Sequence, residues 1–176
     1  MKLCMFSPRD QDLERGWPGR VEGETVIQLA AQTLQAFFTG GGTAREHAEY
    51  QLADVVFRAP VLHPPSVRIF DDAGDFVFAN PAAIKAADEE PAVSGAERVE
   101  RVAAIIGADG AIGGFAPLVE WVAPHLQGAK QRDFALTLGP YVTTADEGAP
   151  PGVDWERLVA HAAENTTLYP GDLIAR

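Results

Sequence analysis

The sequence predicts an α+β fold in which strands predominate, and three observations support this prediction. Gly occurs 17 times and Pro 13 times in 176 residues, which favours many short strands and turns over a bundle of helices. Short apolar runs alternate with turn dipeptides, and few segments have the spacing of a helix. Hydrophobic residues make up 47% of the chain and charged residues 22%, so an ordinary hydrophobic core is expected.

Residues 1–60 are expected to form a small N-terminal module of the α/β type. Residues 30–38 have apolar side chains grouped on one side, which predicts a helix, and the three glycines at 40–42 end it. Pro60 begins a proline-rich stretch that marks the boundary with the main domain, residues 61–176. Strands of the small module are predicted at residues 2–6, 20–22 and 25–29.

The main domain is expected to contain a central hairpin. Val99–Ile106 is an apolar run rich in β-branched residues, and the turn dipeptide at Asp109 joins it to a second extended segment. Asn80 before a proline predicts the start of a helix, and Asp154 is placed to cap the amphipathic helix Trp155–Ala162. Further strands are predicted at residues 111–122, 133–138, 141–143 and 173–175.

The charge and the cysteine content exclude several classes of function. The net charge of -11 argues against a nucleic-acid or anionic-membrane partner, because binding to phosphate needs clustered Lys and Arg. Cys4 is the only cysteine, so neither an internal disulfide nor a thiolate metal site is possible. No segment is apolar over the length of a signal peptide or a membrane span, so we expect a cytoplasmic protein without a membrane partner.

Five segments, in order along the chain, resemble the fumarylacetoacetate hydrolase superfamily. Lys130–Pro140 is similar to the family's Lys-x-x-Asp-Phe-x-x-x-x-Gly-Pro signature, and Thr166–Ala175 is similar to its Thr-Leu-x-Pro-Gly-Asp-x-Ile run. The resemblance covers nearly the whole chain. It implies the family's mixed β-roll or β-sandwich with a few short helices, usually found as a dimer, here a homodimer. The other three segments lie at residues 64–68, 78–84 and 103–121.

The resemblance also implies a metal site whose ligands are mostly missing from this chain. Enzymes of the family are expected to hold Mg²⁺, Mn²⁺ or a similar hard cation on three carboxylates, where it stabilises an enolate. The corresponding positions here are Val99, Arg101 and Glu120, and only Glu120 is an acid. We therefore expect no metal ligand and no cofactor, unless a strand bulge brings Glu100 into place and the family's metal site survives.

Arg101 and Glu120 suggest an ion pair in place of a cation site. The two residues either neutralise each other within a packed hairpin, or Arg101 supplies the charge of the absent metal and anchors a carboxylate or carbonyl oxygen. By resemblance, Lys130 is the active-site lysine that stabilises negative charge on the substrate, or else a surface lysine. Asp133 either orients Lys130 or caps a turn. Three residues of the following turn are expected to shape the substrate pocket: Thr137, Gly139 and Pro140.

No histidine stands where the family's hydrolases have the His–Glu pair that activates water. Residues 66–76 contain none, and His47 is expected on an exposed helix of the N-terminal module. The other three histidines have no carboxylate at a suggestive spacing, although the fold could supply one: His63, His125 and His161.

Hydrolytic C–C cleavage needs an activated water, so a different reaction is expected. The first hypothesis is a metal-independent lyase- or isomerase-like enzyme that enolises, decarboxylates, dehydrates or cyclises a small 2-oxo or 1,3-dicarbonyl acid. Glu120, Lys130 and Asp133 are its catalytic candidates. The second hypothesis is a non-catalytic subunit that binds a small carboxylate ligand, or dimerises with a complete homologue. The third is a metal-dependent C–C hydrolase that survives through a shifted register.

Overall fold

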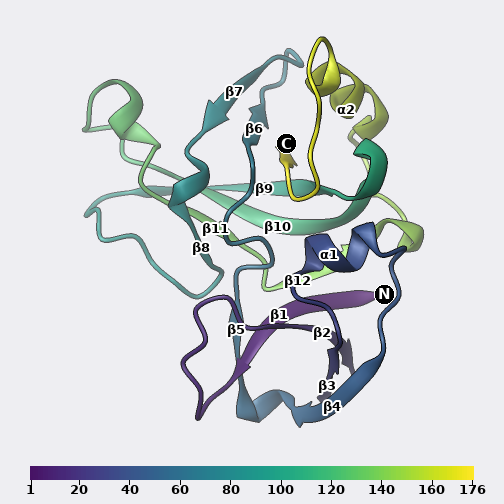
Figure 1. Ribbon diagram of the computed structural model, residues 1–176. Coiled ribbons are helices and arrows are strands. Elements are labelled where there is room, and N and C mark those ends of the chain that lie inside the picture. The colour runs from purple at the N-terminus through teal and green to yellow at the C-terminus, as the bar shows by residue number, and fades with distance from the viewer.

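The computed structural model describes all 176 residues, Met1–Arg176, and its main feature is one continuous mixed sheet (Figure 1). The helices are α1 (Leu34–Thr39) and α2 (Trp155–Ala163). The α+β, mainly β class predicted from the sequence is confirmed. The strands are β1 (Lys2–Pro8), β2 (Trp17–Glu22), β3 (Thr25–Leu29), β4 (Glu46–Gln51), β5 (Val55–Arg58), β6 (Val67–Phe70), β7 (Phe76–Ala79), β8 (Ile84–Ala86), β9 (Glu97–Ile106), β10 (Ile112–Val122), β11 (Leu136–Leu138), β12 (Tyr141–Thr144) and β13 (Leu173–Ala175).

The order of the strands joins the two halves of the chain. It runs β4-β3-β2-β1-β12-β10-β9-β13-β6-β7, with β5 on β1, and with β11 between β10 and β8. Figure 1 shows β1–β5 as a lower group and the long β9–β10 hairpin as the base of an upper group. β1 pairs with β12 across the expected boundary at residue 60. The division into 1–60 and 61–176 therefore remains a prediction, made for a chain whose sheet runs through both parts.

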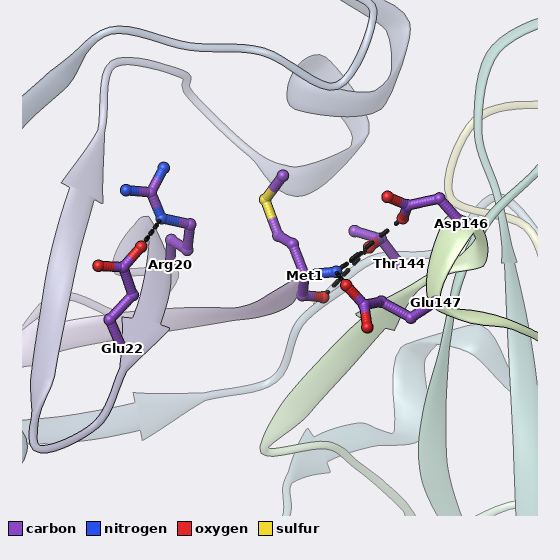
Figure 2. A network of polar contacts seen from close by, with 6 residues as sticks. All are labelled: Met1, Arg20, Glu22, Thr144, Asp146 and Glu147. Carbon is purple, nitrogen blue, oxygen red and sulfur yellow. Dashed lines mark hydrogen bonds and ion pairs between the residues drawn. The ribbon is translucent and has the colours of Figure 1, made fainter.

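The start of β1 is fixed to the end of β12 by a small polar network (Figure 2). The α-amino group of Met1 donates to Glu147 Oε1 at 2.9 Å and to the hydroxyl of Thr144, and it lies 3.9 Å from Asp146 Oδ1. The backbone N–H of Thr144 donates to the carbonyl of Met1 at 2.9 Å. These contacts extend the β1–β12 pairing by one residue beyond its last ladder pair.

The β9–β10 hairpin is the longest element of the fold and confirms the predicted central hairpin. Its register is continuous from Gly114 to Val122, and the only irregularity lies between Ile112 and Gly114. The turn is formed by Asp109 and Gly110, whose φ angles are 53° and 74°. A short polar side chain and a glycine are the residues that tolerate such positive φ values.

Two apolar layers cover the two faces of this hairpin. Side chains alternate along a strand, so Ile105 joins one layer while Ala104 and Ile106 join the other. The first layer is the larger core and includes α1. The second lies under α2, whose first turn is capped as expected by Asp154, which accepts from the N–H of Arg157 at 3.1 Å. Neither helix has the length and apolar character needed to span a bilayer.

Three local expectations are wrong, one because of a local cap and two because strand pairing prevails over local propensity. The helix expected from residue 30 begins only at Leu34, since Thr33 caps it and accepts from the N–H of Ala36. Asn80 caps a single 3₁₀ turn, after which the chain enters β8 and pairs with β11. His47 lies on strand β4, paired with β3, and not on a helix.

Candidate functional site

Arg101 and Glu120 lie on the same face of the β9–β10 hairpin and form an ion pair. Arg101 is opposite Leu118, and Glu120 is opposite Val99, so the two charged residues are diagonal neighbours. Arg101 Nε donates to Glu120 Oε2 at 2.9 Å, and Nη2 of the same guanidinium lies 2.8 Å from that oxygen. The side chain of Glu120 is 1% exposed and that of Arg101 is 17% exposed. The predicted ion pair is therefore present and largely buried.

A second guanidinium, that of Arg132, reaches the same carboxylate, and little in the sequence indicates this contact. Its Nη1 lies 3.2 Å from Glu120 Oε1, and the Arg132 side chain is 45% exposed. The contact is an ion pair without hydrogen-bond geometry, because Oε1 has no hydrogen-bond partner. One carboxylate thus faces two guanidinium groups, which leaves a surplus positive charge. The only sign of Arg132 in the sequence is its place within the Lys130–Pro140 segment, where the family's signature leaves that position open.

Both arginines line a hollow of about 220 Å³, which we call the arginine hollow. Its other walls are the ends of β6 and β7 with the turn between them, residues 69–71 and 75–77. Arg101 is tied to this hairpin, since its Nη1 donates to the carbonyl of Phe70 at 3.5 Å. The fold therefore brings a charged pair on β9–β10 against a hairpin from a distant part of the sequence.

Part of the lining of the arginine hollow is apolar and aromatic. The rings of Phe70 and Phe76 have their centroids 5.1 Å apart. His161 of α2 packs edge-on against both rings, at 5.9 Å and 5.7 Å, and its Nε2 lies 3.9 Å from Asp75 Oδ1. Its Nδ1 lies 3.7 Å from Glu164 Oε2, so His161 has one carboxylate from the fold and one at i+3 in its own sequence, where none was expected.

The turn between β6 and β7 carries three aspartates, and they differ in their surroundings. Asp71 and Asp75 line the arginine hollow. Asp72 does not, and its carboxylate forms an ion pair with Arg176 instead. The hydrogen bond and the positive charge of Arg176 lower the pKa of the Asp72 carboxyl from its ordinary value. Two of the three acids are therefore available to the hollow.

Lys130 and Asp133 form a pair of their own beside the site. Lys130 Nζ lies 2.8 Å from Asp133 Oδ2, and the lysine side chain is 78% exposed. The backbone carbonyl of Asp133 accepts from Asn80 Nδ2 at 2.9 Å. Neither residue lines the arginine hollow, although Arg132 of the same loop does. Their catalytic role remains a prediction.

The three residues expected to shape the substrate pocket lie outside the arginine hollow: Thr137, Gly139 and Pro140. Thr137 is buried and pairs with Val119, so it belongs to the face of the hairpin opposite to Glu120. Gly139 is packed so closely on Pro60 that an added Cβ would approach it to 2.8 Å. Pro140 lines a separate hollow of about 340 Å³. The structure therefore does not bring these three residues to the arginine hollow.

The residues at the expected metal positions do not fit a hard cation. Val99 has no ligand atom, and the guanidinium of Arg101 covers the one carboxylate, Glu120. Glu100 lies on the opposite face of the uninterrupted β9 strand, and its Oε1 is 2.9 Å from Arg98 Nη2. No group of three His, Cys, Asp or Glu side chains is placed to hold a metal ion.

Comparisons with known proteins identify the fold. No protein-family model matches this chain, and neither does any curated protein sequence. Solved structures do match. Maleylpyruvate hydrolase from Sphingobium sp. SYK-6 superposes with a TM-score of 0.79 at 21% identity, covering 99% of this chain and 87% of the other. The same enzyme is also similar in its complex with manganese(II) ion and pyruvate, with a TM-score of 0.76 at 22% identity over 99% and 87% of the two chains.

Two further structures have the same architecture. 2-Keto-3-deoxy-D-arabinonate dehydratase complexed with magnesium and 2,5-dioxopentanoate has a TM-score of 0.70 at 15% identity, covering 99% and 86% of the two chains. A probable 2-hydroxyhepta-2,4-diene-1,7-dioate isomerase from Mycobacterium abscessus has a TM-score of 0.71 at 16% identity, covering 99% and 84%. These similarities extend over nearly the whole chain and confirm the fold implied by the sequence resemblance.

Proposed function

We propose that this chain, which has the fold of the fumarylacetoacetate hydrolase superfamily, is an enzyme that binds a small 2-oxo or 1,3-dicarbonyl acid in the arginine hollow. The proposed chemistry is metal-independent and of the lyase or isomerase type: enolisation, decarboxylation, dehydration or cyclisation. The observation that carries the proposal is the double contact of Arg101 with Glu120 at the place where the fold's metal ligands are expected. Structural neighbours named as a hydrolase, a dehydratase and an isomerase of small acids support the substrate class.

The two guanidinium groups of the site favour an acid as its ligand. Arg101 and Arg132 carry two positive charges next to the one negative charge of Glu120, while the acids Asp71 and Asp75 belong to the β6–β7 side of the hollow. A guanidinium presents N–H donors in a planar fork that matches a carboxylate, or the oxygen pair of a 2-oxo acid. Because Arg132 is partly exposed, its guanidinium can turn to a ligand, which leaves Oε1 of the buried Glu120 without its ion-pair contact.

The same groups suit the formation of an enolate. When a proton leaves the carbon next to a ketone, negative charge moves to the ketone oxygen, and fixed N–H donors stabilise that charge. We propose that Glu120 accepts this proton on Oε1, the oxygen without a hydrogen-bond partner, and returns it to another atom of the ligand. Glu120 is buried and does not itself line the arginine hollow, so the ligand has to reach Oε1 past Arg132. Lys130, steadied by Asp133, is proposed to attract the substrate at the edge of the site.

The test is hydrogen exchange at carbon 3 of 2-oxobutanoate in D₂O, followed by proton NMR in the presence of a metal chelator. We expect the protein to accelerate the exchange above the rate in buffer. Glu120→Gln should abolish the acceleration, and Arg101→Met should weaken it at least about tenfold, the cost of losing one charged stabilising contact. Arg58→Met is the matched control, because Arg58 pairs with Asp12 in the N-terminal part of the chain. Equal exchange by the native protein and Arg101→Met would contradict the proposal.

The role of Lys130 needs a separate comparison. Lys130→Ala is expected to lower the rate of exchange at low substrate concentration and to leave the folding stability unchanged, because the side chain is exposed. Lys85→Ala provides the control, since Lys85 is a lysine paired with Glu89 away from the site. If both variants retain the native rate, Lys130 is a surface residue.

One observation favours the second hypothesis, a non-catalytic subunit that binds ligand or dimerises. Strand β7 is at the end of the sheet order, and its residues Val77 and Phe78 are 52% and 67% exposed. An open strand edge with exposed apolar side chains is suited to association with a second chain, either a copy or a complete homologue. A protein that binds 2-oxobutanoate, forms dimers in light scattering and gives no exchange would support this alternative.

The third hypothesis, a surviving metal-dependent hydrolase, requires ligands that Val99 and Arg101 do not provide. Metal analysis of the purified protein tests it directly. Stoichiometric Mg²⁺ or Mn²⁺ that is lost in Glu120→Gln would support the metal enzyme and overturn the interpretation of the Arg101–Glu120 pair.

A further inference from the structure

Asn80 joins two parts of the lining of the arginine hollow that are far apart in the sequence. It directly follows β7, whose residues Phe76 and Val77 line the hollow. Its Nδ2 donates to the backbone carbonyl of Asp133 at 2.9 Å. Asp133 is the chain neighbour of Arg132, which also lines the hollow. One side-chain amide therefore connects the end of β7 to the backbone beside Arg132.

The loop that carries Arg132 is otherwise held mostly by its own contacts. It comprises residues 123–135, between β10 and β11. Within it, the N–H of Ala123 donates to the carbonyl of Gln131 at 2.7 Å, and Gln131 Nε2 donates to the carbonyl of Leu126 at 2.8 Å. Asn80 makes the only side-chain hydrogen bond that reaches this loop from another segment of the chain.

The side chain of Arg132 is a weak anchor for the loop. It is 45% exposed, and its contact with Glu120 at 3.2 Å lacks hydrogen-bond geometry. A long side chain of this kind loses rotamer freedom when it is held in one place, so a single ion pair at the surface contributes little to order. The position of Arg132 therefore depends on its backbone, and the hydrogen bond to Asp133 lies one residue away.

The amide of Asn80 makes two hydrogen bonds of opposite sense. Its Oδ1 accepts from the N–H of Ala82 at 3.0 Å and caps the 3₁₀ turn, while its Nδ2 donates to the carbonyl of Asp133. Ser or Asp would serve equally well as a cap. An ionised Asp has no donor, and the shorter Ser has no amide nitrogen. The contact with the loop is therefore the part of the arrangement that requires Asn.

From this geometry we propose that Asn80 is a positioning residue of the arginine hollow. By holding the carbonyl of Asp133, it places Arg132 where its guanidinium meets both Glu120 and the carboxylate of a bound acid. Asn80 does not line the hollow, so it acts through Arg132 and not on the ligand. This role rests on the proposed function, since it concerns the binding of acids in the same site.

The first test is the affinity for 2-oxobutanoate, measured by calorimetry in the presence of a metal chelator. Asn80→Asp and Asn80→Ser keep an acceptor for the cap and remove the amide donor. Each should bind at least about tenfold more weakly than the native protein, because small displacements of a binding group are costly. Thr33→Ala is the matched control, since Thr33 caps α1 by accepting from the N–H of Ala36 at 3.0 Å, outside the hollow. It should keep the native affinity.

A second comparison separates positioning from general support of the fold. If Asn80 acts through Arg132, then in the Arg132→Met background the change Asn80→Asp should alter the affinity less than about twofold. A residue that only supports the fold would weaken binding equally in both backgrounds. Without any ligand, trypsin should cleave after Lys130 and Arg132 faster in both Asn80 variants than in the native protein, because the loop has lost its outside contact.

The outcomes distinguish the role of Asn80 from the proposed function. Native affinity in both Asn80 variants would overturn the positioning role alone, and so would an equal loss in the Arg132→Met background. If the native protein does not bind 2-oxobutanoate, the proposed function is wrong. In that case an unchanged rate of tryptic cleavage would also overturn the placing of Arg132 by Asn80, whereas faster cleavage would support it.

Discussion

Replacing the buried carboxylate at the centre of the site tests the structure most directly. In Glu120→Gln, the guanidinium of Arg101 remains 17% exposed and loses its charged partner. Removing one partner of a buried ion pair lowers the free energy of unfolding by about 3–5 kcal/mol. We expect about 3 kcal/mol, the lower end of that range, because Arg132 is 45% exposed and can turn to water.

This cost converts to a measurable shift in melting temperature. An unfolding entropy of about 2.1 cal/mol/K per residue gives about 0.37 kcal/mol/K for a chain of this length. A loss of about 3 kcal/mol therefore lowers Tm by about 8 °C. The double variant Arg101→Met, Glu120→Leu removes both charges at once, and it should be within about 1 kcal/mol of the native protein.

The assay is urea unfolding followed by circular dichroism. The cycle consists of the native protein, Arg101→Met, Glu120→Leu and their double variant, with Glu120→Gln measured beside them. Glu100→Gln is the control, because Glu100 forms an ion pair with Arg98 on the same strand, with side chains 68% and 59% exposed. An exposed pair of that kind contributes less than about 1 kcal/mol. If Glu120→Gln is no more destabilising than Glu100→Gln, or if the double variant shows no coupling, the description of the site as a buried ion pair is wrong.

Three other changes test the fold and its surface. Burial raises the pKa of the Cys4 thiol from its ordinary 9.0 to about 12. Between these two pH values the unfolded chain loses the thiol proton while the folded chain keeps it, so the free energy of unfolding should fall by about 1.4 kcal/mol per pH unit. Below pH 9 the thiol has no such effect, and urea unfolding of Cys4→Ala should lack this part of the pH dependence throughout. Gly114→Ala would place a Cβ 2.6 Å from the backbone carbonyl of Thr143, and it should lower the urea stability by about 2 kcal/mol; native stability would contradict the β10–β12 pairing. Phe78→Ser should cost less than about 1 kcal/mol, since the ring is 67% exposed, and should reduce any self-association seen in sedimentation; an unfolded variant would refute this.

Strand β9 and helix α2 were predictable from the sequence. Val99–Ile106 is apolar and β-branched, and it forms most of β9. Asp154 and the spacing of the apolar residues behind it gave helix α2 to within one residue. Both the apolar run of β9 and the cap of α2 are local features of the sequence, and the structure contains the elements that they predict.

Elements whose structure depends on a distant partner were not predictable in this way. The capping signal at Asn80 is real, but Ile84–Ala86 pairs with β11 and no helix follows. The same reason explains His47, which a neighbouring strand holds in extended conformation. Local propensity contributes less than the ladder hydrogen bonds and burial that a sheet provides.

The candidate site also has one part that the sequence predicts and another part that depends on distant segments. The Arg101–Glu120 pair could be predicted because the family resemblance pointed to both positions, and the two residues belong to one hairpin with an identifiable turn. The contact of Arg132 could not, since it depends on how the loop after β10 returns to the strand. The two aspartates of the arginine hollow lay in a turn that the sequence identified only as solvated.

The place of β13 in the sheet has a consequence for folding during synthesis on the ribosome. The β6–β7 hairpin, which forms one wall of the arginine hollow, pairs with β13 in the sheet, and β13 in turn pairs with β9. From Val67 to its partner Leu173 the chain is 106 residues longer (173 − 67), a length that synthesis at about 5–20 residues per second needs about 5–20 s to add. The hairpin with its exposed Phe78 therefore waits without its partner strand while these residues are added, and the sheet beside the arginine hollow is completed only when β13 emerges.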